Sequence, residues 1–183
     1  MDALSKHSFP PIVGPNARIL VLGTLPGEES LRLQQYYGHR QNHFWPIIAA
    51  MCGEDLPAEY PERVAMVLRS EIALWDVLQS AVRDGSSLDS AIVGECANDF
   101  ADFFHQHPTI RRVAFNGKNA RKFFKRHVEK SQQLPADLEL LDPLPSTSPA
   151  YARPLEFKAT LWRDILMGHF AIQAVDVQKR RAK

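Results

Sequence analysis

A continuous apolar run followed at once by a loop with two glycines constrains the fold more than any other feature of this sequence. Residues 19–22 are Ile-Leu-Val-Leu, a run typical of a strand buried on both faces. In the GTLPG loop that follows, Gly23 and Gly27 permit close backbone approach and Pro26 stiffens the turn. Residues 28–35 then favour a short helix whose first amides point back at the loop, a favourable arrangement for an anion. The stretch predicts one strand–loop–helix unit of a parallel sheet.

The same alternation continues along the chain. Apolar runs predict further strands at residues 72–75, 113–115 and 138–141. Helical patterns lie between them and after them, at residues 43–51, 62–69, 98–107 and 118–128, with a last helix opening at Pro154. One face of that last helix is expected to be apolar through Leu161, Trp162, Ile165, Leu166 and Phe170. Residues 85–97 are small and polar and predict a loop. The order favours a three-layer α/β/α fold around a central four-stranded parallel sheet.

Composition limits the class of protein. A chain of 183 residues, 45% of them hydrophobic, suits a single domain over residues 1–183, with residues 1–16 as a surface arm and 177–183 as a basic tail. Because 22 basic residues nearly balance 21 acidic ones, any contact with nucleic acid must come from a local patch. Two cysteines favour a reducing compartment and exclude a four-cysteine iron–sulfur cluster. No run is apolar enough for a signal peptide or a membrane span, so the expected location is the cytoplasm.

Unusual polar segments follow each predicted strand. Ligands of parallel sheets bind at the carboxyl ends of the strands. GTLPG follows the first strand, Asp76 closes the second in ALWDV, Asn116 closes the third in FNG, and LPSTSPAYA follows the fourth. A further segment, YYGHRQNHFW at residues 36–45, holds polar and aromatic side chains where a core element would have aliphatics. Convergence of these segments at one sheet edge predicts an active site there.

These motifs, taken in order with GSSLDSAI at residues 85–92, resemble the uracil-DNA glycosylase superfamily. The likeness is strongest to its hypoxanthine-DNA (deoxyinosine) glycosylase branch, whose pattern couples a G-x-x-P-G-x-x-S-L loop to an N-x-F-W segment and a late L-P-S-T-S-P segment. It spans residues 18–162. The resemblance implies a base-excision repair enzyme that hydrolyses the N-glycosidic bond of a deaminated base in DNA, above all hypoxanthine, and leaves an abasic site.

The resemblance assigns the catalytic role to Asn42. The reaction builds positive charge on the sugar and negative charge on the leaving base, so a placed water and a stabilised base are needed, without a metal. Several relatives carry Asn, Asp or Glu at the third position of the first loop, where this chain has Leu25. The Asn42 carbonyl could orient water, or its amide could hydrogen-bond the base, although it cannot act as a general base like a carboxylate. The alternative is a cap for the following helix, and one residue could do both.

A flipped base needs an aromatic face and hydrogen bonds to its edge. By the resemblance Tyr37 supplies the face, while Thr24 and Leu25 line the pocket. Asp76 and Asn116 are candidate edge readers, although Asn116 could instead serve the FNG turn. For the neighbouring histidines of residues 36–45, a surface or capping role is the default and a phosphate contact the second interpretation.

Contacts to the DNA backbone are expected from two loops. The hydroxyl residues between Pro145 and Pro149 can donate to phosphates. Tyr151 and Arg153 are candidates for the wedge that fills the vacated space and for a phosphate contact, or they pack on the last helix; the family commonly has Asn at position 151. The predicted DNA-binding residues are Gly23, Pro26, Gly27, Ser146, Thr147, Ser148, Tyr151 and Arg153.

The expected enzyme is therefore a monomeric, monofunctional glycosylase that needs no cofactor or metal. The segments assigned to the pocket contain no lysine, which argues against a bifunctional lyase. Two alternatives remain open: a mismatch-specific uracil-DNA glycosylase, and a non-catalytic nucleic-acid or nucleotide-binding domain of the same fold. The basic stretch at residues 121–130 is interpreted as a solvated helix face with Phe123 and Phe124 turned to the core.

Overall fold

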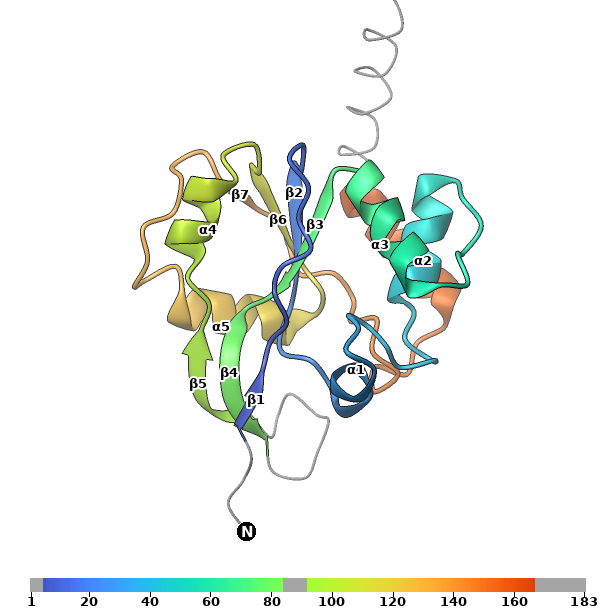
Figure 1. Ribbon diagram of the computed structural model, residues 1–183, viewed down its shortest axis with the longest axis horizontal. Coiled ribbons are helices and arrows are strands. Elements are labelled where there is room, and N and C mark those ends of the chain that lie inside the picture. The colour runs from blue at the N-terminus through green and yellow to red at the C-terminus, as the bar shows by residue number, and fades with distance from the viewer. Residues whose placement is uncertain (1–4, 84–91, 167–183) are drawn as a thin grey trace, which may run out of the picture.

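Four parallel strands form the centre of the protein. The computed structural model describes residues 5–83 and 92–166. The central sheet has the order β3-β2-β6-β7, built from Ile72–Asp76, Ile19–Gly23, Arg112–Phe115 and Glu139–Leu140 (Figure 1). Strand β2 is buried along its whole length, as the continuous apolar run predicts for a central strand.

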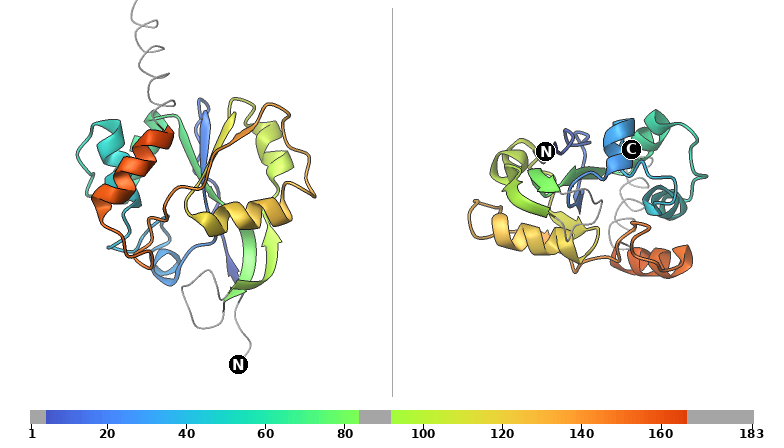
Figure 2. Two further views of the ribbon diagram at one scale, coloured as in Figure 1. Left: turned by 180° about the vertical axis from the view of Figure 1, so that it is seen from behind. Right: turned by 90° about the horizontal axis from the view of Figure 1, so that it is seen from below.

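Helices cover both faces of this sheet. One layer holds α2 (Phe44–Cys52), α3 (Tyr60–Arg69) and the helical residues 155–166; the other holds α4 (Phe100–Gln106) and α5 (Lys118–His127) (Figures 1 and 2). The short helix α1 (Glu28–Leu33) lies below α2 in Figure 1. The predicted three-layer α/β/α fold with its four-stranded parallel sheet is confirmed.

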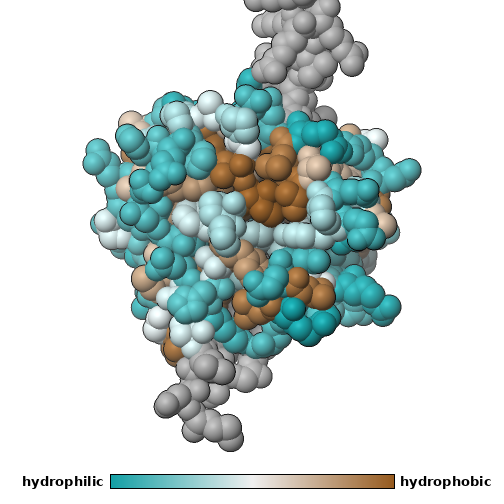
Figure 3. Space-filling view, viewed as in Figure 1, coloured by the Kyte–Doolittle hydropathy of each residue, from teal (hydrophilic) through white to brown (hydrophobic). Residues whose placement is uncertain are grey.

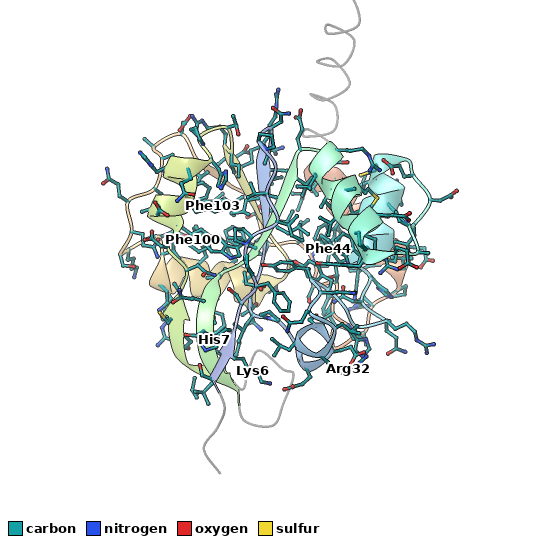
Figure 4. All side chains as sticks on the ribbon, in the orientation of Figure 1. Lys6, His7, Arg32, Phe44, Phe100 and Phe103 are labelled. Atoms are coloured by element: carbon teal, nitrogen blue, oxygen red, sulfur yellow. The ribbon has the colours of Figure 1, made fainter. Side chains whose placement is uncertain are left out.

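The alternating side chains of β2 divide the core into two parts. Ile19 and Val21 pack with residues of α2 and α3 and with Trp162. Leu20 and Leu22 pack with residues of α4 and α5. Figure 4 shows Phe44 on the first side and Phe100 and Phe103 on the second. The face drawn in Figure 3 is largely hydrophilic, with apolar side chains gathered over the middle of the sheet.

A second, antiparallel sheet was not predicted. It has the order β1-β4-β5, from Ser5–His7, Leu78–Arg83 and Ile92–Ala97. The loop predicted for residues 85–97 is therefore wrong for residues 92–97, and part of the expected N-terminal arm is a strand. Only Ile92 of β5 is buried, so this edge strand carries mostly polar or small residues and lacks a continuous apolar run. Most of the GSSLDSAI motif, residues 85–91, lies outside the described residues.

The last helix is only partly as predicted. Its described turns follow Pro154, and Trp162 and Leu166 are fully buried, but Leu161 is 38% exposed. The apolar face is narrower than expected. Phe170 and the tail at residues 177–183 lie outside the described residues. Within the ranges described, no helix has the length and apolar character to cross a membrane.

Candidate active site

The carboxyl ends of the parallel strands bring the polar segments together. Gly23 at the end of β2 pairs in register with Asp76 at the end of β3. On the other side of β2, Asn116 follows β6 and forms an isolated bridge with Leu144. Four segments that are separated in the sequence thus meet at one sheet edge, where α/β proteins bind their ligands.

Gly23 is required at this edge for close packing. A Cβ atom placed on Gly23 would lie closer to Asp76 Oδ1 than the 3.0 Å that real Cβ atoms keep, and 3.5 Å from Tyr37 Oη. Asp76 is only 5% exposed, and Thr24 is also buried. The missing side chain of Gly23 therefore lets a buried carboxylate and a phenol approach the same stretch of backbone.

Tyr37 lies in this cluster in an unusual backbone conformation. Its φ of 54° falls in the left-handed region that residues other than glycine seldom adopt. Its ring stacks on Phe44, with centroids 3.8 Å apart and planes 21° apart, so one face is already covered. Burial, and then the Asp76 charge, raise the pKa of Tyr37 above its ordinary value, while Asn116 opposes the rise. The hydroxyl therefore stays protonated, and base stacking, which needs the other ring face, remains a prediction.

Asn42 occupies the turn that starts α2. Its Oδ1 accepts a hydrogen bond from Phe44 N at 3.0 Å, and its own backbone N–H donates to His39 O at 2.8 Å. The N-cap residue of α2 is His43, so Asn42 lies one residue before the cap and serves the helix by accepting from its first amide. In the described part of the chain, the Nδ2 amide of Asn42 has no hydrogen-bond partner, and the residue is half-buried. The amide is therefore available to a ligand even though the carbonyl is engaged.

Asn116 and Thr147 hold the last loop against the sheet. Asn116 Nδ2 donates to Thr147 Oγ1 at 2.8 Å, and Thr147 N donates to Asn116 Oδ1 at 2.9 Å. The Thr147 carbonyl accepts from His43 N at 3.0 Å, which ties the same loop to the start of α2. Thr147 is 0% exposed, so its expected phosphate contact does not fit the structure. Asn116 uses its amide oxygen and an amide N–H on this loop and also interacts with Tyr37, which favours a structural role over reading a base edge.

Ser146 and Ser148 keep donors for a ligand. Both are half-buried, and each hydroxyl oxygen accepts a backbone N–H: Ser146 from Ser148 N at 3.3 Å, and Ser148 from Ala150 N at 3.2 Å. Neither hydroxyl donates to another described residue. Beyond them Tyr151 is 41% exposed, and the exposed Arg153 guanidinium lies 5.5 Å from the Phe157 ring centroid. Both side chains are exposed, as the predicted DNA contacts require, and those contacts stay predictions.

A lysine that sequence reasoning missed lies beside this loop. Lys158 is 0% exposed, and its Nζ donates to Ser148 O at 3.1 Å. Burial, and then the Lys158 charge, lower the pKa of His43 below its ordinary value. A signal was present in the sequence, because residues 155, 158, 159 and 162 share one helix face and only Lys158 among them is charged.

The first loop contributes differently from what was expected. Leu25 packs into the core beside α4 and α5, and Pro26 is buried, whereas the space around Gly27 is open. The first turn of α1 carries Glu28 and Glu29, which pair with Lys6 and Arg32. Figure 4 shows these two basic residues near α1. Two carboxylates in the first turn oppose a phosphate at this helix start, so the expected anion site there is not supported.

No group of three His, Cys, Asp or Glu side chains within residues 5–83 and 92–166 is arranged to hold a metal ion. The described side chains at the site are a buried carboxylate, a phenol, amides and hydroxyls.

Comparison with known proteins identifies the family. A family model of the uracil DNA glycosylase superfamily matches residues 10–166. The chain belongs to the uracil DNA glycosylase superfamily. It lies on the branch represented by two curated relatives named hypoxanthine DNA glycosylase. The protein of Methanosarcina barkeri is 39% identical over 121 residues, 66% of this chain and 76% of that protein. The protein of Methanosarcina acetivorans is 39% identical over 119 residues, 64% of this chain and 75% of that protein.

A solved structure in the superfamily agrees with the fold. The solution NMR structure of a Methanosarcina acetivorans protein, described as a proposed uracil DNA glycosylase, superposes with a TM-score of 0.74 at 31% identity. The match covers 91% of this chain and 99% of that one. The superfamily fold therefore extends over nearly the whole chain, including the strand ends that form the candidate site.

Proposed function

We propose that this protein is a monofunctional DNA glycosylase that hydrolyses the N-glycosidic bond of deoxyinosine, releases hypoxanthine and leaves an abasic site. The observation that carries the proposal is the position of Asn42. Its turn is hydrogen-bonded through His43 to the loop after β7, and its amide keeps a donor for a ligand. The 39% identity to relatives named hypoxanthine DNA glycosylase supports the choice of base.

Asn42 can serve the reaction in either of two ways, through its amide or through its carbonyl oxygen. Negative charge develops on the departing base, and a donor placed before the reaction lowers the barrier without reorganising solvent. The Nδ2 amide supplies that donor. The Oδ1 atom, which already accepts from Phe44 N, has a second lone pair that can orient the attacking water.

Asp76 supports selection of a deaminated base. Deamination of adenine to hypoxanthine, or of cytosine to uracil, converts a ring nitrogen that accepts hydrogen bonds into an N–H donor. Carboxyl oxygens accept hydrogen bonds, so the buried Asp76 side chain suits the ring N–H of a deaminated base better than the lone pair of the undamaged base. Removing such a complementary pair costs discrimination of several orders of magnitude. Hypoxanthine and uracil share this N–H, so mismatch uracil excision remains the second candidate.

Single-turnover excision by Asn42→Ala tests the proposal. On duplexes carrying deoxyinosine or uracil, the rate should fall about a hundredfold or more, as for loss of one preorganised contact, while affinity for lesion DNA changes little. Folding should survive, because the lost Phe44 contact is worth about 1 kcal/mol. Gln41→Ala is the matched control, since it removes an exposed amide one residue away.

Three outcomes separate the alternatives. An Asn42→Ala protein that keeps nearly full activity on both lesions makes Asn42 a helix cap only. Asn42→Asp retains activity if the residue acts through its carbonyl oxygen on water, and loses it if the amide donates to the base. A wild-type protein that binds the lesion but releases no base from any duplex is the non-catalytic binding domain.

We also propose that the enzyme acts in the cytoplasm as a monomer without cofactor or metal. Cys52 and Cys96 are free thiols, which suits a reducing compartment. Excision should persist in excess chelator. Activity that disappears with chelator and returns with a divalent ion would overturn the metal-free mechanism.

A further inference from the structure

The ammonium of Lys158 is buried beneath the loop that follows β7. The residue is 0% exposed on the described helical turns at 155–166. Its Nζ donates to the carbonyl of Ser148 at 3.1 Å and lies 5.4 Å from the centroid of the Tyr151 ring. Both contacts are to the turn at residues 148–151, which is closed by Tyr151 N donating to Ser148 O at 3.1 Å. The Ser148 carbonyl oxygen thus accepts two hydrogen bonds, one from Tyr151 N and one from Lys158 Nζ.

The positive charge of Lys158 is not neutralised within the described structure. None of the described carboxylates forms an ion pair with it, and its recorded partners are a neutral carbonyl and an aromatic ring. Burial accordingly lowers the pKa of Lys158. A buried charge is costly without an opposite charge, so an anion brought close to Lys158 would stabilise it.

Two further observations place this charge at the site. It also acts on His43, whose backbone N–H is bonded to Thr147 O in the same loop. Ser146 and Ser148, both half-buried in that loop, keep hydroxyl donors that no described residue accepts. A phosphate accepting from those hydroxyls would be the missing anion, stabilised through a loop that excludes water from the ammonium.

We propose that Lys158 is a positioning residue that holds the 148–151 turn from beneath and supplies the positive charge for a DNA phosphate bound by Ser146 and Ser148. This role rests on the proposed function, because it assumes DNA at this edge of the sheet. It requires no contact between Lys158 and the base.

The test compares Lys158→Met with Arg163→Met. Methionine keeps an unbranched side chain but removes the charge and the donor, and Arg163 is an exposed cation of the same helix. Affinity for an undamaged duplex is measured over a range of salt concentrations. The slope of log affinity against log salt is negative, and for Lys158→Met it should become shallower by about 0.9, the value for one neutralised phosphate. For Arg163→Met it should stay at the wild-type value. Excision by Lys158→Met should slow at least tenfold on deoxyinosine and on uracil alike.

A double variant tests whether the lysine acts through the loop. If it does, Ser148→Ala should cost much less in the Lys158→Met background than in the wild type, because the turn it belongs to is already released. Strictly additive losses overturn the proposal. An unchanged salt slope for Lys158→Met, or an equal fall for Arg163→Met, also overturns it.

The proposal stays testable if a variant does not fold. In the wild-type protein, NMR of the lysine side-chain nitrogens should show a slowly exchanging ammonium that shifts when undamaged duplex is added. A Lys158 ammonium that exchanges like an exposed one, or does not respond to the duplex, refutes the role. The binding and NMR measurements do not depend on base release. Absence of excision in the wild type would therefore overturn the proposed function, while the role of Lys158 would still be decided by these two measurements.

Discussion

Replacing Gly23 by alanine tests whether the close approach of Asp76 and Tyr37 to β2 is needed for catalysis. The new Cβ would enter the space of Asp76 Oδ1 and lie 3.5 Å from Tyr37 Oη. The carboxylate must then recede by roughly half an ångström or more, because the backbone of β2 is fixed between two strands. Such overpacking typically costs about 1–3 kcal/mol, and displacement of a catalytic group by about 1 Å costs up to a hundredfold in rate.

Thermal unfolding and single-turnover excision measure the two effects of Gly23→Ala separately. A loss of about 1–3 kcal/mol lowers Tm by about 2–12 °C in a domain of this size. Excision of hypoxanthine should slow by about tenfold to a hundredfold at a temperature where the variant is folded. Gly14→Ala is the control, since its Cβ would meet only Leu68 Cδ2 at 3.4 Å, an ordinary contact. A Gly23→Ala protein with the Tm and the excision rate of the wild type would refute the reasoning.

Three further predictions concern the loop and its neighbours. Ser148→Ala should weaken DNA binding and slow excision of hypoxanthine and uracil in equal proportion, because backbone contacts carry no base identity; loss on one base alone, in the same rate assay, would place the loop in the base pocket. The pKa of His43 is lowered in the folded protein, so below about pH 6.5 the unfolded chain binds more protons than the folded one. Stability therefore decreases as the pH is lowered, until the pH passes the folded pKa. Urea unfolding of His43→Gln from pH 5 to 8 should lack this part of the decline, and a decline as steep as in the wild type would contradict the assignment. Borohydride should trap no covalent adduct with abasic DNA, since Lys158 is buried; a trapped band that disappears in Lys158→Met would establish lyase chemistry.

The parallel sheet could be predicted because each of its strands is marked in the sequence by a local apolar run. Continuous apolar runs placed the second and third strands within one residue of Ile72–Asp76 and Arg112–Phe115. Gly53, just past the helix predicted at residues 43–51, is the C-cap of α2 with φ of 68°, a conformation that favours glycine. The antiparallel sheet could not be predicted in this way. Strand β5 has a single buried residue and so lacks an apolar run, and the position of β4 depends on its pairing with β5.

The site was predictable as a set of segments and not as a set of contacts. Gly23, Asp76 and Asn116 each end or follow a strand of one parallel sheet. Their convergence at one edge therefore follows from the topology alone. The reciprocal bonds between Asn116 and Thr147 join residues 31 positions apart and depend on how the last loop folds back. Lys158 was overlooked because a lysine in a helix is usually solvated, and only its place on the buried face marks it as different.

The small strand β1 has a practical consequence for handling this protein. Ser5–His7 pairs with the outer edge of β4, with Lys6 opposite Ala81, and so covers backbone groups that would otherwise be open. The superfamily match begins at residue 10, which invites trimming the chain to residues 10–166. Such a shortened protein would carry a bare edge able to recruit strands from other copies, and we expect it to aggregate. Affinity tags and cleavage sites are therefore better placed ahead of Ser5.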